Sequence, residues 1–139
     1  MKNVASPEDA QRNIVRVRFA QALHQQSALD SHDDERVHAF RLACKRLRSA
    51  IERLDPQPPR IDRAEALLSR LTDELGWAHD CTQLAQLAGD CAAPLVATRA
   101  RRDRDRYVLR ARRLWRHAFR SSGEFAELAG YAGFTWSVS

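Results

Sequence analysis

The sequence predicts an all-α protein, an antiparallel four-helix bundle followed by a short C-terminal helix. Apolar residues, which make up 44% of the 139-residue chain, recur at helical rather than strand spacing. Only five glycines and five prolines interrupt the sequence, which leaves long segments free to form helices. The length suits one hydrophobic core, so we expect residues 1–139 to form a single domain.

The first two helices have clear boundary signals. Ser6 followed by Pro7 is typical of a helix start, and we expect the first helix to run from about Pro7 to Leu29. A second helix is expected from Ser31 and should end before Pro56, since proline cannot continue it. The buried side of the first helix is predicted to contain Ile14, Val15, Phe19, Ala22 and Leu23.

A third helix is expected at about residues 61–88, with Gly76 marking a close helix contact or a bend. Its predicted core positions are Leu67, Leu68, Leu71, Leu75, Ala78, Leu84 and Leu87. After Gly89 and Pro94 a fourth helix should extend to about Arg120, and Ser122 with Gly123 should separate it from a short helix over 124–132. Short connections between long helices predict antiparallel neighbours.

The second helix carries two interlocked rows of residues. The apolar row, at spacings of 3 and 4, predicts a buried seam of Val37, Phe40, Cys44, Leu47, Ile51 and Leu54. A basic row follows one residue later, about 100° around the helix, and contains His38, Arg41, Lys45 and Arg48. Neighbouring cations in such a row repel one another, and a multiply charged anion would remove that repulsion.

The fourth helix carries a second basic ribbon, which changes the balance of interpretations. Residues 99–120 hold ten arginines against two aspartates, whereas residues 1–98 hold 13 basic and 14 acidic side chains. The ribbon consists of Arg99, Arg102, Arg106, Arg110, Arg113, His117 and Arg120. One basic row could be a solvated flank whose stems cover apolar surface. Two rows on one small bundle favour a polyanionic partner, and arginine forks favour phosphate.

Other functional classes find less support in the sequence. Three widely spaced cysteines predict reduced, mostly buried thiols rather than a disulfide framework or a zinc site. No segment suits a membrane span or a secretory signal, so we expect a cytoplasmic protein. Glu35 and His38 form one ExxH element, whereas a di-iron bundle needs two, so no metal or cofactor is expected. His79 and Asp80 are adjacent and therefore point in different directions on a helix, which is poor geometry for an acid/base pair. We therefore do not expect an enzyme.

Three segments resemble the CHAD domain, the conserved histidine α-helical domain family. The second helix matches its hallmark pattern with His38, Arg41, Leu42, Lys45, Arg46, Leu47 and Arg48. LGWAHD at 75–80 is similar to the family's Leu-Gly-x-x-Arg-Asp, with His79 in the arginine position. RRLWRHAFRSSGEFAEL at 112–128 is similar to its later basic helix and turn, so the resemblance covers about residues 8–132.

The resemblance implies a helical protein that binds inorganic polyphosphate and is associated with polyphosphate granules or polyphosphate-metabolising partners. Carried over by position, the ligand-binding candidates are His38, Arg41, Lys45, Arg46, Arg48, Arg113, Arg116 and Arg120. The chain resembles only one half of a CHAD domain, chiefly the N-terminal half, and we expect a homodimer to supply the other. Nucleic-acid binding is the main alternative, and a partner-binding helical module without an anion ligand is a third.

Overall fold

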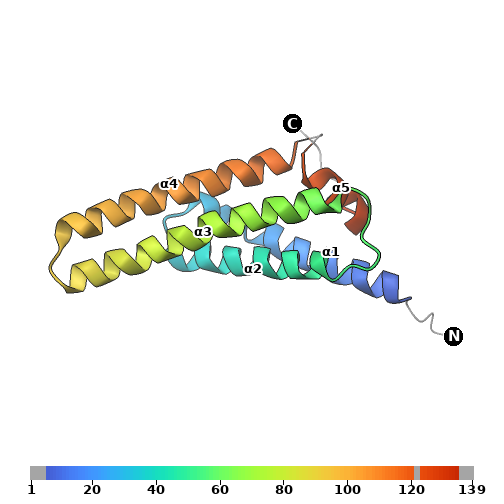
Figure 1. Cartoon of the computed structure of the whole chain (residues 1–139), viewed down its shortest axis with the longest axis horizontal. Helices are drawn as coiled ribbons and strands as arrows, with labels where there is room; N and C mark the ends of the chain where they lie inside the picture. The colour runs from blue at the N-terminus through green and yellow to red at the C-terminus, as the bar shows by residue number, and fades with distance from the viewer. Residues whose placement is uncertain (1–5, 121–122, 135–139) are drawn as a thin grey trace.

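The computed structural model describes residues 6–120 and 123–134, and this part of the chain is an all-α bundle without a β-strand (Figure 1). Four long helices, α1 (Pro7–His24), α2 (Asp34–Glu52), α3 (Ile61–Asp90) and α4 (Pro94–Ala118), run antiparallel to their neighbours in sequence. A short 3-10 helix, η1 (Gln26–Asp30), connects α1 to α2, and α5 (Phe125–Ala132) follows α4. The predicted fold class is confirmed.

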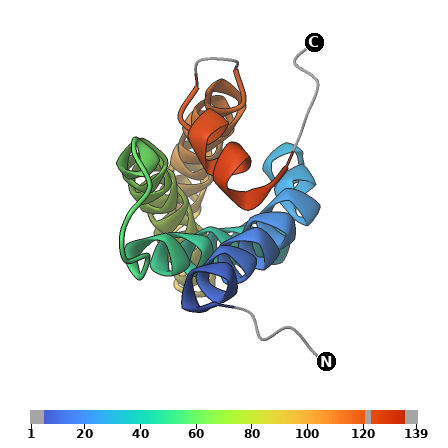
Figure 2. The same ribbon diagram turned by 90° about the vertical axis from the view of Figure 1, so that its right-hand side faces the viewer.

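The helices form two hairpins that pack as layers, α1 with α2 and α3 with α4, while α5 lies across one end (Figure 2). The core is continuous between the layers because the 3-and-4 apolar seams of α2, α3 and α4 all face inward. Its aromatic end joins Trp115 to Phe40 and Phe125 in edge-to-face contacts, with ring centroids 5.0 and 5.2 Å apart. Phe19 of α1 contacts the same cluster, so α5 closes the bundle by covering this end of the core.

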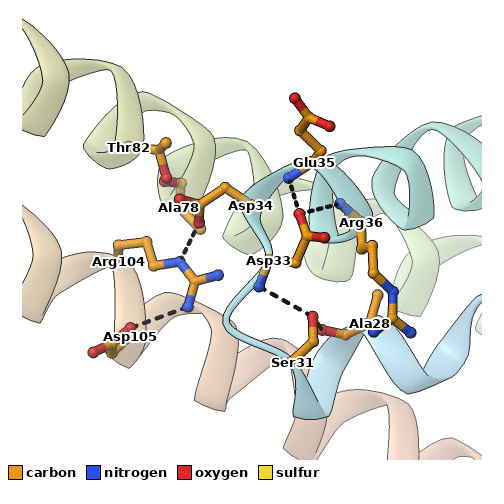
Figure 3. Close-up of polar contacts among 10 residues, drawn as sticks. All are labelled: Ala28, Ser31, Asp33, Asp34, Glu35, Arg36, Ala78, Thr82, Arg104 and Asp105. Carbon is orange, nitrogen blue, oxygen red and sulfur yellow. Dashed lines mark hydrogen bonds and ion pairs between the residues drawn. The ribbon is translucent and has the colours of Figure 1, made fainter.

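Some helix boundaries differ from those predicted from the sequence. α1 ends at His24 rather than Leu29, since the next residues tighten into η1, where Ala28 and Leu29 remain buried. α2 begins at Asp34 rather than Ser31, because the Asp33 carboxylate accepts hydrogen bonds from the amides of Glu35 and Arg36 (Figure 3). α4 ends at Ala118, and the Ser122 part of the predicted turn lies outside the described residues.

Several predicted core residues are on the surface. Ile14 is 53% exposed, and Leu84 and Leu87 are 46% and 60% exposed, so these three predictions are wrong. Leu84 follows the exposed Trp77 by seven residues and the buried Leu75 by nine, so it lies on the outer side of α3, opposite the buried row. The tip of the α3–α4 hairpin extends beyond the ends of α1 and α2 (Figure 1). Leu23 is only half-buried. Of the cysteines, Cys44 is buried but Cys91 is exposed, which corrects the expectation of mostly buried thiols.

Candidate anion-binding grooves

A large group of cations lies in an open hollow of about 780 Å³ between α3, α4 and the residue before α5. We call it the arginine groove; its lining residues are Arg70, Glu74, Arg110, Arg113, Leu114, Arg116, His117, Arg120 and Glu124. Arg113 and His117 occupy successive turns of α4, Arg120 follows just after its end, and Arg70 reaches the hollow from α3. Five arginines therefore converge against two glutamates, which gives the groove a net positive charge.

Not every arginine in this groove is equally available. Arg116 forms an ion pair with Asp30 at 3.1 Å, so part of its charge is already compensated. The side-chain oxygens Oε2 of Glu74 and Glu124 are buried and have no hydrogen-bond partner among the described residues. These carboxylates weaken the positive field locally, but all five arginines of the groove are exposed and a phosphate chain can approach them.

A second hollow, of about 600 Å³, lies on the outer face of the other layer. We call it the α1–α2 groove; it is lined by Gln11, Ile14, Arg18, Leu42, Lys45, Arg46, Ser49, Ala50 and Arg53. Lys45 and Arg46 are exposed here, and Arg18 and Arg53 join them from α1 and the C-terminus of α2. Four cations line this hollow without an acidic residue, but they share it with apolar side chains.

The basic row of α2 does not act as one exposed ribbon. Arg41 lies against α3, where its Nε donates a hydrogen bond to the Thr72 carbonyl at 3.2 Å. A Cβ at Gly76 would come within 3.2 Å of the Arg41 guanidinium, so the glycine makes room for this side chain. The predicted close contact at Gly76 is thus confirmed. Arg48 pairs with Glu52 on its own helix, with 3.0 Å between Nε and Oε1.

His38 contacts the LGWAHD segment of α3 directly. Its ring stacks on that of His79 with 4.2 Å between the ring centroids and 21° between the ring planes. Nδ1 of His38 is buried and has no hydrogen-bond partner among the described residues. Burial, followed by the charges of His79, Arg41 and Lys45, lowers the pKa of His38 from its ordinary value of 6.5. His38 is therefore mainly neutral at neutral pH.

This shift predicts a specific pH dependence of stability. Because the folded state holds the pKa of His38 below 6.5, the unfolded chain binds the proton first as the pH falls. The contribution of His38 to the free energy of unfolding should be fully present above pH 6.5. It should be lost as the pH drops from 6.5 toward the pKa of His38 in the folded state. We expect His38→Gln to lose less stability than the wild type over this range in urea unfolding experiments. His24→Gln, at an exposed position on α1, is the control, and equal pH profiles for all three proteins would contradict the assignment.

Arg104 anchors the α3–α4 hairpin to the start of α2. Its side chain is 9% exposed, and its Nε donates to the Asp34 carboxylate at 2.7 Å while Nη1 contacts Asp105 at 3.0 Å (Figure 3). Nη2 has no partner among the described residues. Among the arginines of α4, this one is structural rather than a surface cation.

Sequence reasoning missed four arginines of these two grooves as site residues: Arg18, Arg53, Arg70 and Arg110. Arg110 was recognisable from its place in the ribbon of α4. Arg18 and Arg70 lie on helices for which no basic row is predicted, and Arg53 caps the end of α2 outside its basic row, so only tertiary packing brings these three to the grooves. Conversely, Arg104 precedes Val108, Ala111 and Trp115 at the spacing of the buried seam, a signal that could have identified it as buried.

Other kinds of site find no support in the described part of the chain. Residues 6–120 and 123–134 contain no group of three or more histidine, cysteine or carboxylate side chains placed to hold a metal ion. None of their helices is long and apolar enough to cross a membrane. The thiol of Cys44 is fully buried, which raises its pKa and makes it a poor nucleophile.

Comparison with known proteins identifies one family. The family model of the CHAD domain matches residues 13–129, which is most of the chain and includes both histidines of the stacked pair. No curated protein and no solved structure gives a significant match.

Proposed function

The chain belongs to the CHAD domain family, and from this premise we propose that it binds inorganic polyphosphate electrostatically, without turning it over. The arginine groove is the main site, and the α1–α2 groove is a secondary one. A binding role of this kind fits a protein that is recruited to polyphosphate granules or to enzymes that act on polyphosphate.

The observation that carries the proposal is the convergence of Arg70, Arg110, Arg113, Arg116 and Arg120 on one open groove. Arginine forks suit phosphate oxygens, since the guanidinium can donate two parallel hydrogen bonds to one phosphate. Polyphosphate places a negative charge on every unit of an unbranched chain, so it can contact several of these arginines along successive turns of α4. The groove is an open surface rather than an enclosed cavity, as a long flexible polymer requires.

Nucleic-acid binding remains the second candidate, and one observation favours it. Trp77 is 48% exposed and lies beside Tyr107, with ring centroids 5.7 Å apart, while Arg110 lies over the Tyr107 ring. Exposed aromatic rings next to arginines can stack on unpaired bases. The residues that line the two grooves themselves include no phenylalanine, tyrosine or tryptophan, which favours a ligand without bases.

Competition distinguishes the two ligands. Labelled long-chain polyphosphate is bound to the protein and challenged with equal phosphate equivalents of single-stranded RNA, duplex DNA or unlabelled polyphosphate. Because both classes of ligand give salt-sensitive affinity, the ionic strength must be the same in all arms. We expect unlabelled polyphosphate to displace the label at much lower concentration than either nucleic acid.

The Trp77→Leu variant sharpens this experiment, because it removes the exposed aromatic ring and keeps every charge. Polyphosphate binding should be unchanged in this variant. Displacement by RNA at concentrations as low as those of unlabelled polyphosphate, together with its loss in Trp77→Leu, would overturn the ranking in favour of nucleic acid. A protein that binds neither polymer would have basic rows that act only as solvated flanks.

A further inference from the structure

The outer face of the α3–α4 hairpin carries a strip of apolar side chains that the fold leaves uncovered. We call it the hairpin strip and define it by Trp77, Leu84, Val96 and Tyr107. Trp77, Leu84 and Val96 are 48%, 46% and 47% exposed, and Trp77 contacts the half-buried Tyr107 across the hairpin. Leu84 follows Trp77 by two helical turns, and Val96 precedes Tyr107 by three, so the four residues share one side of the hairpin.

This exposure has no counterpart in the rest of the surface. Of the seven large apolar residues that are exposed in the described chain, five lie on the α3–α4 hairpin, where Leu87 and Leu95 extend the set toward the tip. The two others, Ile14 and Val17, lie on α1. Soluble monomers seldom expose apolar residues in a contiguous group, and such groups mark interaction sites.

The charges on either side of the strip indicate what covers it. Asp73 and Asp80, one turn from Trp77 on α3, form an acidic rim, and both are exposed. Arg99, Arg106 and Arg110 are exposed on the α4 side, where the half-buried Asp103 pairs with Arg106 at 3.5 Å, so this side forms a rim of net positive charge, the basic rim. A surface with an apolar centre, one acidic rim and one basic rim is complementary to itself when it is turned over about its long axis. That operation places α3 of one copy on α4 of the other.

We propose that two copies of this chain associate through the hairpin strip, about a two-fold axis parallel to the α3–α4 hairpin. In this arrangement Trp77 faces Tyr107 of the second copy, and the acidic rim of each copy faces the basic rim of the other. The apolar strip supplies the affinity, and the rims fix the orientation, because the alternative two-fold axis across the hairpin would oppose like charges.

A matched pair of substitutions tests the location of the interface. Val96 in the strip and Val17 on α1 are both valines that are 47% exposed, so Val96→Asp and Val17→Asp introduce the same charge at the same exposure. Light scattering and sedimentation without polyphosphate at micromolar concentration should give twice the chain mass for the wild type and for Val17→Asp. Val96→Asp should give the mass of one chain, with unchanged helicity by circular dichroism.

A mixing experiment tests the orientation. Asp80→Arg and Arg106→Asp each create two like-charge contacts in a homodimer, so each variant alone should be monomeric. In an equimolar mixture every contact between the rims is again complementary, and heterodimers should form. A monomeric wild type, equal dissociation by Val17→Asp, or a mixture that stays monomeric would each overturn the proposal. None of these results depends on whether the chain binds polyphosphate.

Discussion

Replacing Arg70, Arg113 and Arg120 by alanine should weaken polyphosphate binding by roughly 100-fold at low salt. These three arginines line the arginine groove from α3, from α4 and from the segment just after α4, respectively. A hydrogen bond to a charged group contributes about 1.5–3 kcal/mol when it is shielded, and exposure reduces this to about 1 kcal/mol for each arginine. Titration with fluorescent polyphosphate at several salt concentrations measures the loss, and the salt dependence should become shallower.

Two further triple variants make this result specific. Arg12, Arg36 and Arg101 lie outside both grooves, on three different helices, so their replacement by alanine changes the net charge equally. That control should bind polyphosphate within a few-fold of the wild type. The triple alanine variant of Arg18, Lys45 and Arg53 should fall between the two. An equal loss of affinity in the control would show that net charge alone explains the effect. A larger loss in the variant of the α1–α2 groove would show that this groove, and not the arginine groove, is the main site.

The helices could be predicted from sequence because their signals are local. Ser6 and Pro7 specify the start of α1, and the Ser6 hydroxyl does accept a hydrogen bond from the amide of Asp9 at 3.1 Å. The end of α1 could not be predicted, since the η1 turn keeps Ala28 and Leu29 buried without continuing the helix. Periodicity specifies which side of a helix is apolar, but not whether another element covers it. Leu87, at the tip of the hairpin, is 60% exposed, and Leu84 falls half a turn around α3 from the buried Leu75, so its apolar character alone was a misleading signal.

The candidate site was predictable by residue type and less so by placement. Spacing placed His38, Arg41, Lys45 and Arg48 at the border of the buried seam, where a rotation of a few tens of degrees decides between packing and exposure. Arg41 and His38 fall on the side that meets α3, through Thr72 and His79, while Lys45 opens onto the α1–α2 groove. Alanine substitution of Arg41 should therefore affect packing as well as binding, which makes it a poor probe of the ligand.

The largest expected effect on stability comes from removing the carboxylate that pairs with Arg104. Asp34→Ala leaves a guanidinium that is 9% exposed with only the surface residue Asp105 as a partner. Breaking a buried pair in this way leaves a buried charge without its partner. Because the lost partner is 46% exposed, we expect the free energy of unfolding to fall by about 2–3 kcal/mol, which is below the range for fully buried pairs. Equilibrium urea unfolding measures this loss, and Glu52→Ala, which breaks an exposed pair on α2, should cost at most about 0.5 kcal/mol.

Removing Arg104 and removing Asp34 should not cost the same stability. This difference distinguishes a buried charge left without a partner from a simple loss of contacts. Arg104→Met removes the buried charge and keeps an apolar stem, while Asp34 can return to water because it is 46% exposed. We therefore expect Arg104→Met to cost less than Asp34→Ala, and the double variant to resemble Arg104→Met. If Asp34→Ala were as mild as Glu52→Ala, the guanidinium would have found water or another acceptor. The link between α4 and α2 would then be a surface contact rather than an anchor of the bundle.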